Sequence, residues 1–278
     1  MAAQRQVAIV TGAASGIGRA MALGLLEGGI DVAGVDRDAA LLSELEADAG
    51  GKTGTLQPVR ADLADPAAFD AVIAAVLDRS GRIDVLVNNA GIGQGSVRAD
   101  QRTNPLRFWE ITPEQWGRFV AVNATAPLMM ARAVTPHMLR AKRGRIVTVT
   151  TSLGTMIRGG YVLYGASKAA AEAATAVMAA DLAGTGVTAN VLVPGGMTDT
   201  RIVPDGAVAD RSRMLRPAIM APPLMWLVSD EAANVSGRRF LAAHWDRSLP
   251  PAQAAEKCGA PIAWTSIATM PIEPPRRH

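Results

Sequence analysis

Two side chains that could exchange protons, Tyr164 and Lys168, stand four residues apart in the segment YVLYGASKAAA, whose composition favours a helix. On a helix, this spacing places both side chains on one face. A neighbouring ammonium favours the phenolate, so we expect the pKa of Tyr164 to lie below its ordinary value of about 10. Tyr161 has no such partner, because Gly165 follows it by four residues. The pair predicts a tyrosine that exchanges protons near neutral pH, with a surface pair on an amphipathic helix as the alternative.

A glycine-rich turn near the N-terminus predicts a nucleotide site. The apolar run 7–10 favours a strand, TGAASGIG follows at residues 11–18, and helical periodicity begins at Arg19. Glycines there let the backbone turn tightly and let a pyrophosphate approach, and the helix N-terminus offers it unpaired amides. We expect a dinucleotide to contact five residues of this turn: Gly12, Ser15, Gly16, Ile17 and Gly18.

An acidic residue after the second expected strand bears on the choice of cofactor. Asp36 ends the apolar segment 31–35, eighteen residues after Gly18. An acid at about that distance hydrogen-bonds an adenosine ribose, and a turn or helix-capping role is the alternative. The carboxylate would repel the 2′-phosphate of NADP, whereas Arg37 could pair with that phosphate or stack on the adenine. We therefore expect NAD, with NADP as the alternative.

The remaining segments predict a doubly wound α/β fold with a parallel sheet of about seven strands and helices on both faces. Further strands are expected at 54–60, 83–87, 145–149, 187–193 and 237–243, with helical segments between most of them. Alternating strands and helices require a parallel sheet, whose ligands bind at the carboxyl edge. At that edge, Asp62 and Leu63 could meet the adenine, although Asp62 could equally begin the next helix. A helix expected from Thr112–Pro113–Glu114 towards Val134 contains Asn123, an unfavourable position unless its amide is used or packed.

Composition excludes several other classes of protein. The 278 residues are 49% hydrophobic and 19% charged, which fits one catalytic domain over 1–246 with an extension, 247–278, that packs on the domain or on a neighbouring subunit. The net charge of +3 is dispersed, so no nucleic-acid partner is expected. The single Cys258 and three scattered histidines predict neither an internal disulfide nor a metal site. Without a secretory signal or an apolar run of roughly 20 residues, we expect a cytoplasmic protein that does not cross a membrane.

The order of these motifs resembles the short-chain dehydrogenase/reductase family over about residues 5–243. The resemblance rests on five motifs: TGAASGIG at 11–18, NNAG at 88–91, Asn123, Tyr164 with Lys168, and Pro194-Gly195. It implies hydride transfer between a nicotinamide cofactor and a secondary alcohol or ketone. Tyr164 would be the acid/base, Lys168 would hold the nicotinamide ribose and lower the pKa of Tyr164, and Asn123 would hold a water that links Lys168 to solvent.

The residues expected at the cofactor follow from the turn, the strand ends and the resemblance together. Met197 and Thr198 match family positions that bind the nicotinamide amide. The complete set is Gly12, Ser15, Gly16, Ile17, Gly18, Asp36, Arg37, Asp62, Leu63, Asn89, Ala90, Gly91, Tyr164, Lys168, Pro194, Gly195, Met197 and Thr198.

The sequence departs from the family in its active-site hydroxyl. The family places a serine after its fifth strand, but the position thirteen residues before Tyr164 is Thr151. Thr151 can supply a hydroxyl, and its methyl narrows the site; Ser152 could take the role after a shift of one residue. We expect Thr151.

Two other departures concern the substrate. The loop 92–112 is longer than usual by roughly ten residues, and its Arg98, Arg102 and Arg107 could cover or line the pocket. The chain also continues for 32 residues beyond Asp246, with Trp264 among them. Five side chains favour a partly apolar pocket: Met156, Ile157, Tyr161, Met197 and Met214. Arg158 and Arg201 could bind an acid.

These expectations combine into an NAD(H)-dependent oxidoreductase that acts on a small-molecule alcohol or carbonyl compound. The family usually forms homotetramers or dimers, so a homo-oligomer is expected. The alternatives are an NADPH-dependent ketone reductase, a non-catalytic dinucleotide-binding regulator, and a dehydratase or epimerase on the same scaffold. Asn123, Tyr164 and Lys168 argue against the regulator.

Overall fold

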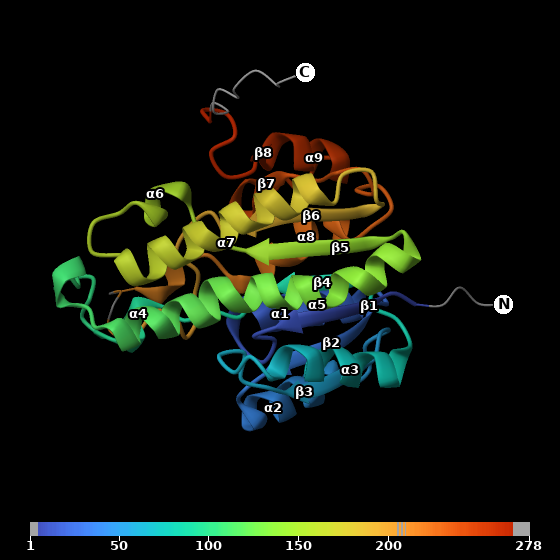
Figure 1. Ribbon diagram of the computed structural model, residues 1–278, viewed down its shortest axis with the longest axis horizontal. Coiled ribbons are helices and arrows are strands. Elements are labelled where there is room, and N and C mark those ends of the chain that lie inside the picture. The colour runs from blue at the N-terminus through green and yellow to red at the C-terminus, as the bar shows by residue number, and fades with distance from the viewer. Residues whose placement is uncertain (1–4, 205, 207, 209, 269–278) are drawn as a thin grey trace, which may run out of the picture.

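The computed structural model describes residues 5–204, 206, 208 and 210–268, and one eight-stranded sheet forms its centre in the order β3-β2-β1-β4-β5-β6-β7-β8 (Figure 1). The strands are β1 Val7–Thr11, β2 Asp31–Asp36, β3 Leu56–Arg60, β4 Val85–Asn88, β5 Gly144–Val149, β6 Val187–Val193, β7 Arg238–Leu241 and β8 Gly259–Pro261. The first seven pair in parallel, which confirms the doubly wound α/β prediction.

The expected number of about seven strands omits β8, which pairs antiparallel with β7. Its sequence, Gly-Ala-Pro, carries no β-branched or aromatic side chain, so nothing local marks it as a strand. The strand belongs to the extension after Asp246, whose helix α9, Pro251–Cys258, buries Cys258 in the main core. The described part of the extension therefore packs on its own domain.

Helices cover both faces of the sheet. They are α1 Gly16–Glu27, α2 Ala39–Ala49, α3 Ala68–Ser80, α4 Pro113–Val120, α5 Ala126–Ala141, α6 Leu153–Met156, α7 Val162–Asp181, α8 Ala221–Leu227 and α9. One apolar core joins the sheet to α1 and α8, and the other joins it to α3, α5 and α7 (Figure 1). Successive residues of β1 alternate between the two, with Ala8 and Val10 in the first core and Val7 and Ile9 in the second.

The single helix expected from Thr112 is interrupted by a π-helical turn. Thr112 and Gln115 form a capping box, since the Gln115 amide donates to the Thr112 hydroxyl (3.2 Å) and the Thr112 amide donates to the Gln115 side chain (3.0 Å). After α4, residues 121–125 form the π-helical turn that contains Asn123, and α5 continues beyond Val134. Such turns frequently occur at functional sites.

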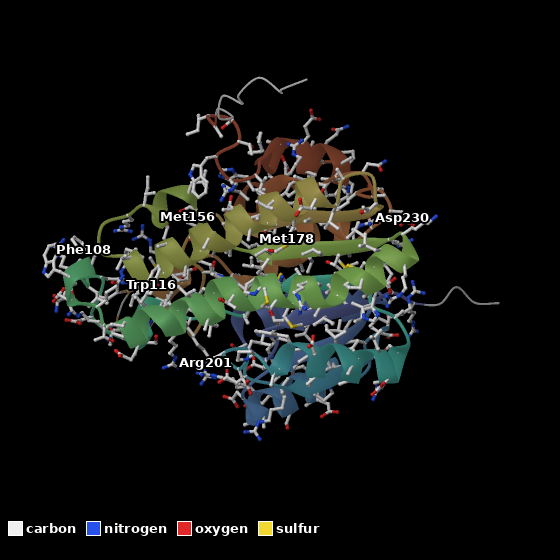
Figure 2. All side chains as sticks on the ribbon, in the orientation of Figure 1. Phe108, Trp116, Met156, Met178, Arg201 and Asp230 are labelled. Atoms are coloured by element: carbon white, nitrogen blue, oxygen red, sulfur yellow. The ribbon has the colours of Figure 1, made fainter. Side chains whose placement is uncertain are left out.

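The loop 92–112 projects beyond the sheet, and Phe108 points outward at its far end (Figure 2). Arg98 forms an ion pair with Glu110 at 3.1 Å, and the Arg107 backbone amide donates to the same carboxylate. Of the three arginines expected to cover or line the pocket, only Arg102 lines a cavity among the described residues. Arg107 directly precedes the short helical turn 108–110, and Arg98 pairs with Glu110 of that turn.

Candidate functional site

Two adjoining cavities open at the carboxyl edge of the sheet, where the strand order reverses between β1 and β4. The first has a volume of about 800 Å³ and the second about 310 Å³. Tyr164 and Pro194 line both. A crevice at the reversal of strand order is where open α/β sheets bind their ligands.

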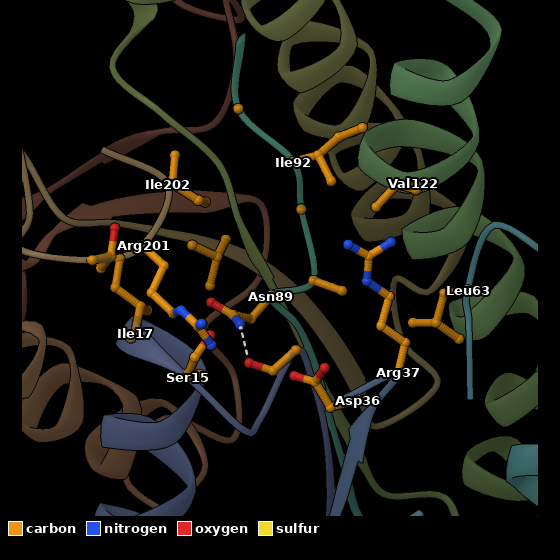
Figure 3. A pocket seen from close by; sticks show the side chains of 18 of the residues that line it. Ser15, Ile17, Asp36, Arg37, Leu63, Asn89, Ile92, Val122, Arg201 and Ile202 are labelled. Carbon is orange, nitrogen blue, oxygen red and sulfur yellow. Dashed lines mark hydrogen bonds between the residues drawn. The ribbon is translucent and has the colours of Figure 1, made fainter. Parts of the chain in front are cut away.

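The glycine turn forms the floor of the first cavity (Figure 3). Gly12 and Gly16 adopt φ values of 63° and 53°, which disfavour other residues. A Cβ on Gly18 would lie 1.9 Å from the carbonyl oxygen of Gly12, so only glycine fits there. Ser15 caps α1 without a side-chain hydrogen bond, and the first turn of the helix has no acidic residue. The Ser15 hydroxyl and the first backbone amides of α1 are therefore suited to bind a pyrophosphate.

Asp36 is held at the cavity by two backbone amides. One carboxylate oxygen accepts from Ala14 (3.1 Å) and the other from Asp38 (3.2 Å). The cap of α2 is Asp38, which accepts from the amides of residues 40 and 41. Figure 3 shows the Arg37 side chain extending from the end of β2 into the cavity, and within the described residues it has no ion-pair partner. Asp62 and Leu63 line the same cavity, where Asp62 accepts from the amide of residue 64.

Asn89 fastens the glycine turn to the end of β4. Its side-chain amide donates to the carbonyl oxygens of Thr11 (2.9 Å) and Gly12 (3.2 Å). The Thr11 hydroxyl in turn accepts from the backbone amides of Asn89 (2.9 Å) and Ala90 (3.0 Å). Asn89, Ala90 and Gly91 all line the first cavity. The Asn89 side chain thus forms part of the cavity wall, and its nitrogen is already hydrogen-bonded to the glycine turn.

Asn123 is completely buried and lines neither cavity. Its oxygen accepts from the Ile92 amide (2.8 Å), and its nitrogen donates to the Ile92 carbonyl (3.0 Å) and to the Ser167 hydroxyl (3.0 Å). The side chain therefore joins the loop after β4 to α7. A Cβ on Gly91 would lie 3.3 Å from Nζ of Lys168, so the glycine leaves room for the ammonium at the cavity.

The environment of Tyr164 differs from the expected one. Burial raises the pKa of the phenol above its ordinary value, a hydrogen bond with Thr151 partly opposes this, and Tyr161 adds to it. Lys168 donates to the carbonyl oxygen of Val149 (2.9 Å), and burial lowers its pKa to about 8. The predicted lowering of the Tyr164 pKa by Lys168 is therefore wrong, because burial raises this pKa and Lys168 is not among the groups that shift it.

The two candidate hydroxyls have different surroundings. Thr151 is half-buried, lines the second cavity and interacts with the Tyr164 phenol, whose pKa it lowers. Ser152 also lines that cavity, but it is exposed, and its hydroxyl lies 2.7 Å from the Thr155 hydroxyl. Of the two, only Thr151 is therefore in contact with the phenol.

The Pro194–Thr198 segment divides between the cavities. Pro194 lines both, whereas Gly195, Met197 and Thr198 line the second rather than the first. Gly195 has a φ of 91°, which turns the chain at the end of β6. Of the five side chains expected in an apolar pocket, only Tyr161 and Met197 line the second cavity. Met156 and Met214 are buried elsewhere, and Ile157 is 82% exposed.

Several residues of the first cavity had not been expected at the cofactor, among them Arg201, which had been expected only as a possible partner of an acid. Arg118 and Val122 reach the cavity from α4 and the π-helical turn, and Thr200 and Arg201 follow the Pro194–Thr198 segment. Figure 3 shows Arg201 extending towards the start of α1. The position of Thr200 and Arg201 could have been inferred from the chain order, because they closely follow a segment that had been expected at the cofactor.

The most important omission is Gln94, which caps the helix that carries Tyr164. Gln94 is 3% exposed, and its side-chain oxygen accepts from the backbone amide of Tyr164 (3.2 Å). Its nitrogen donates to the Gly160 carbonyl (2.8 Å) and to the Gln101 side chain (3.1 Å). Tyr161, the residue before α7, supplies no side-chain cap. Because this cap comes from a loop 70 residues away in the sequence, no local signal predicted it at the start of α7.

Within the described ranges, no helix has the length and apolar character needed to cross a membrane. The same residues hold no group of three or more His, Cys, Asp or Glu side chains that could bind a metal ion.

Comparison with known proteins extends over most of the chain. A family model described as short chain dehydrogenase matches residues 6–207. A D-threitol dehydrogenase of Mycolicibacterium smegmatis is 36% identical over 176 residues, which are 63% of this chain and 64% of that protein. A 2-(R)-hydroxypropyl-CoM dehydrogenase of Xanthobacter autotrophicus is 38% identical over 179 residues, 64% of this chain and 69% of that one. The match thus spans just under two thirds of the first of these relatives.

A solved structure resembles the fold more completely. It is a metagenomic short-chain oxidoreductase in complex with NADP, with a TM-score of 0.71 and 29% sequence identity. The similarity covers 85% of this chain and 96% of that one. It therefore includes residues beyond the 6–207 matched by the family model.

Proposed function

Because the chain belongs to the short-chain dehydrogenase family, we propose that it is an oxidoreductase that interconverts a secondary alcohol and a ketone with NAD(H) as cofactor. One observation carries the proposal: Tyr164 lines both cavities, and Thr151 lies close enough to its phenol to oppose the rise in pKa that burial causes. A dinucleotide in the larger cavity and a small substrate in the smaller one would both reach this phenol.

The residues of the first cavity fit a dinucleotide. The glycine cradle, the free Ser15 hydroxyl and the N-terminus of α1 suit a pyrophosphate, and the fixed Asp36 carboxylate suits ribose hydroxyls. Lys168 lies beside Gly91 at the opposite end and would hold the second ribose. When bound, the nicotinamide supplies or accepts the hydride. Arg37, Arg118 and Arg201 add positive charge near the phosphates.

Tyr164 would donate the proton during ketone reduction and remove it during alcohol oxidation. Burial keeps the phenol protonated at neutral pH, so it is ready to donate to the substrate oxygen as the hydride reaches the carbon. The Thr151 hydroxyl would also bind the substrate oxygen and so orient it towards the Tyr164 phenol. For oxidation, Tyr164 must first lose its proton, a step that the Lys168 charge would favour. Neutral pH therefore favours reduction.

Replacement of Asp36 tests the choice of cofactor. We expect the wild-type protein to show a higher kcat/KM with NADH than with NADPH, because the carboxylate repels a 2′-phosphate. Asp36→Ala should shift the NADH to NADPH ratio of kcat/KM by about tenfold or more towards NADPH, a change of about 1.4 kcal/mol. Arg37→Ala should have the opposite effect and lower kcat/KM for NADPH. An unchanged ratio in Asp36→Ala would show that Asp36 does not discriminate.

Paired substitutions test the active-site hydroxyl. Thr151→Val keeps the shape of the side chain and should lower kcat/KM about 10- to 100-fold, because a hydrogen bond to the developing charge is lost. Ser152→Ala should lower it less than about threefold, since that hydroxyl is exposed and bonded to Thr155. Steady-state rates of NADH oxidation give both values. A large loss in Ser152→Ala alone would move the role to Ser152.

Gln94 is a positioning residue whose effect can be separated from stability. Gln94→Leu removes the cap from the helix that carries Tyr164 and should lower kcat about tenfold, with a loss of about 1–3 kcal/mol in the free energy of unfolding. Gln115→Ala removes a similar cap from α4 and should cost about 1 kcal/mol with little change in kcat. Urea unfolding and initial rates distinguish the two. Equal kcat in both variants would reduce Gln94 to a structural residue.

A further inference from the structure

We propose that the substrate is a small hydroxy or oxo acid, whose carboxylate binds Arg102 and Arg158 in the second cavity. The inference rests on the proposed function and adds the chemical class of the substrate. The cavity, of about 310 Å³, lies at the lower end of the size range for ligand sites. Its wall includes the hydroxyls of Thr151 and Tyr164.

The described residues that line the second cavity carry positive charge and no carboxylate to balance it. Arg102 and Arg158 are the only charged side chains among its described lining residues, and no Asp or Glu of the described chain lines it. They come from different segments, the loop 92–112 and the chain between α6 and α7. Two cations in a partly enclosed cavity raise the local concentration of anions.

Neither arginine has a carboxylate partner within the described residues. Arg102 donates to the sulfur of Met197 at 3.5 Å, and a thioether is a weak acceptor. Arg158 lies over the ring of Tyr161, 5.0 Å from its centre. Stacking of this kind positions a guanidinium and leaves its N–H groups at the edge for another ligand.

Three other arginines near this cavity, by contrast, are paired. Arg98 in the same loop lies 3.1 Å from Glu110, and Arg211 and Arg216 both lie 2.7 Å from Asp199. Protein carboxylates thus neutralise these three arginines. The two that face the cavity are left for a ligand, and a guanidinium fork matches a carboxylate in two parallel hydrogen bonds.

The structure also changes which arginines could act together. Sequence reasoning joined Arg158 with Arg201, but Arg201 lines the first cavity and not the second. Arg102 takes its place beside the reactive hydroxyls. A bound carboxylate would therefore lie in the same cavity as Thr151 and Tyr164, which places the reacting carbon between the hydroxyls and the arginines.

A matched substrate panel tests the proposal. Short oxo acids of increasing length, such as 2-, 3- and 4-oxo acids, are compared with their primary amides in NADH oxidation. The amides keep the shape and remove the charge. We expect kcat/KM to be at least tenfold higher for the best acid than for its amide, and the difference to shrink as NaCl is raised.

Variants locate the effect. Arg102→Met and Arg158→Met should each lower kcat/KM for the acid about 10- to 100-fold and leave the amide within about threefold. Arg102→Lys should recover part of the loss. Arg132→Met, on the exposed side of α5, makes the same change in charge outside the cavities and should have no such effect.

Binding provides a readout that does not require turnover. The oxo acid should raise the melting temperature of the NAD-bound wild-type protein, and Arg102→Met and Arg158→Met should each abolish the increase. If the wild type turned over acid and amide equally, and Tyr164→Phe lost the activity, the proposed carboxylate recognition would be overturned. The proposed oxidoreductase function would remain intact. Acid binding that depends on both arginines without turnover of any member would support the anion site and overturn the oxidoreductase.

Discussion

Replacing Tyr164 with phenylalanine should lower kcat about 10²- to 10⁴-fold, the usual contribution of a positioned general acid or base. The change removes one oxygen atom and keeps the ring of a residue that lines both cavities. We therefore expect the melting temperature and the Kd for NADH to remain close to those of the wild type. Initial rates at saturating ketone, followed by NADH absorbance, measure the effect.

The chain contains two tyrosines, so Tyr161 provides a natural comparison. Tyr161→Phe keeps the ring beneath Arg158 and removes a hydroxyl from the second cavity. Its effect on kcat should be much smaller, below about tenfold. Unchanged turnover in Tyr164→Phe would instead favour the non-catalytic, dinucleotide-binding alternative.

The raised pKa of Tyr164 predicts opposite pH profiles for the two directions. The protonated phenol is the acid for reduction, so the rate should be constant at low pH and fall as pH rises through the pKa of Tyr164. Oxidation needs the phenolate, so its rate should rise over the same range. Both limbs should disappear in Tyr164→Phe. A reduction rate that increases with pH would contradict the assignment.

Breaking the buried ion pair between Glu172 and Arg239 should have the largest effect on stability. Glu172 is completely buried and Arg239 is 6% exposed, with 2.8 Å between the carboxylate and Nε. The other carboxylate oxygen accepts from the Thr150 hydroxyl (2.7 Å), and Arg239 donates to the Thr151 carbonyl (3.0 Å). The pair therefore holds the end of β5, where Thr151 faces Tyr164.

The extension shares this network. The backbone amide of Ala263 donates to the Glu172 oxygen that Arg239 also contacts (3.2 Å). The pair thus connects α7, which carries Tyr164 and Lys168, with β7 and with the chain after β8. A shift in the extension would be transmitted to Thr151 through three hydrogen bonds, which join Ala263 to Glu172, Glu172 to Arg239, and Arg239 to the Thr151 carbonyl.

Glu172→Ala leaves the Arg239 charge buried without a counter-ion, so we expect a loss of about 3–5 kcal/mol in the free energy of unfolding. Combining Glu172→Leu with Arg239→Met should recover most of this loss, because an apolar pair carries no buried charge. The double variant should still have a lower kcat, since neither side chain can hold residues 150 and 151. Urea unfolding and initial rates report the two effects separately.

An exposed ion pair serves as the control. Lys257 and Asp246 lie 3.0 Å apart with 60% and 32% of their side chains exposed. Lys257→Ala should therefore cost no more than about 1 kcal/mol and leave kcat unchanged. If Glu172→Ala cost equally little, the buried pair would not hold the end of β5.

Much of the fold and the cofactor cavity follows from patterns that neighbouring residues carry. Continuous apolar runs predicted the seven parallel strands, and positive φ at Gly12 and Gly16 is a property that glycine itself permits. The spacing of Tyr164 and Lys168 follows from the helix period. These features depend on interactions within a few residues, so the sequence by itself determined them.

Only the tertiary structure decided how the reactive groups are held. The sign of the Tyr164 pKa shift depends on burial by distant segments, and its helix is capped by Gln94 from another loop. The pairing of Glu172 with Arg239 spans 67 residues, and β8 has no local strand signal. Desolvation, long-range hydrogen bonds and buried charge pairs arise only when the sheet brings its strand ends together. The physical reason is that no window of neighbouring residues contains both partners.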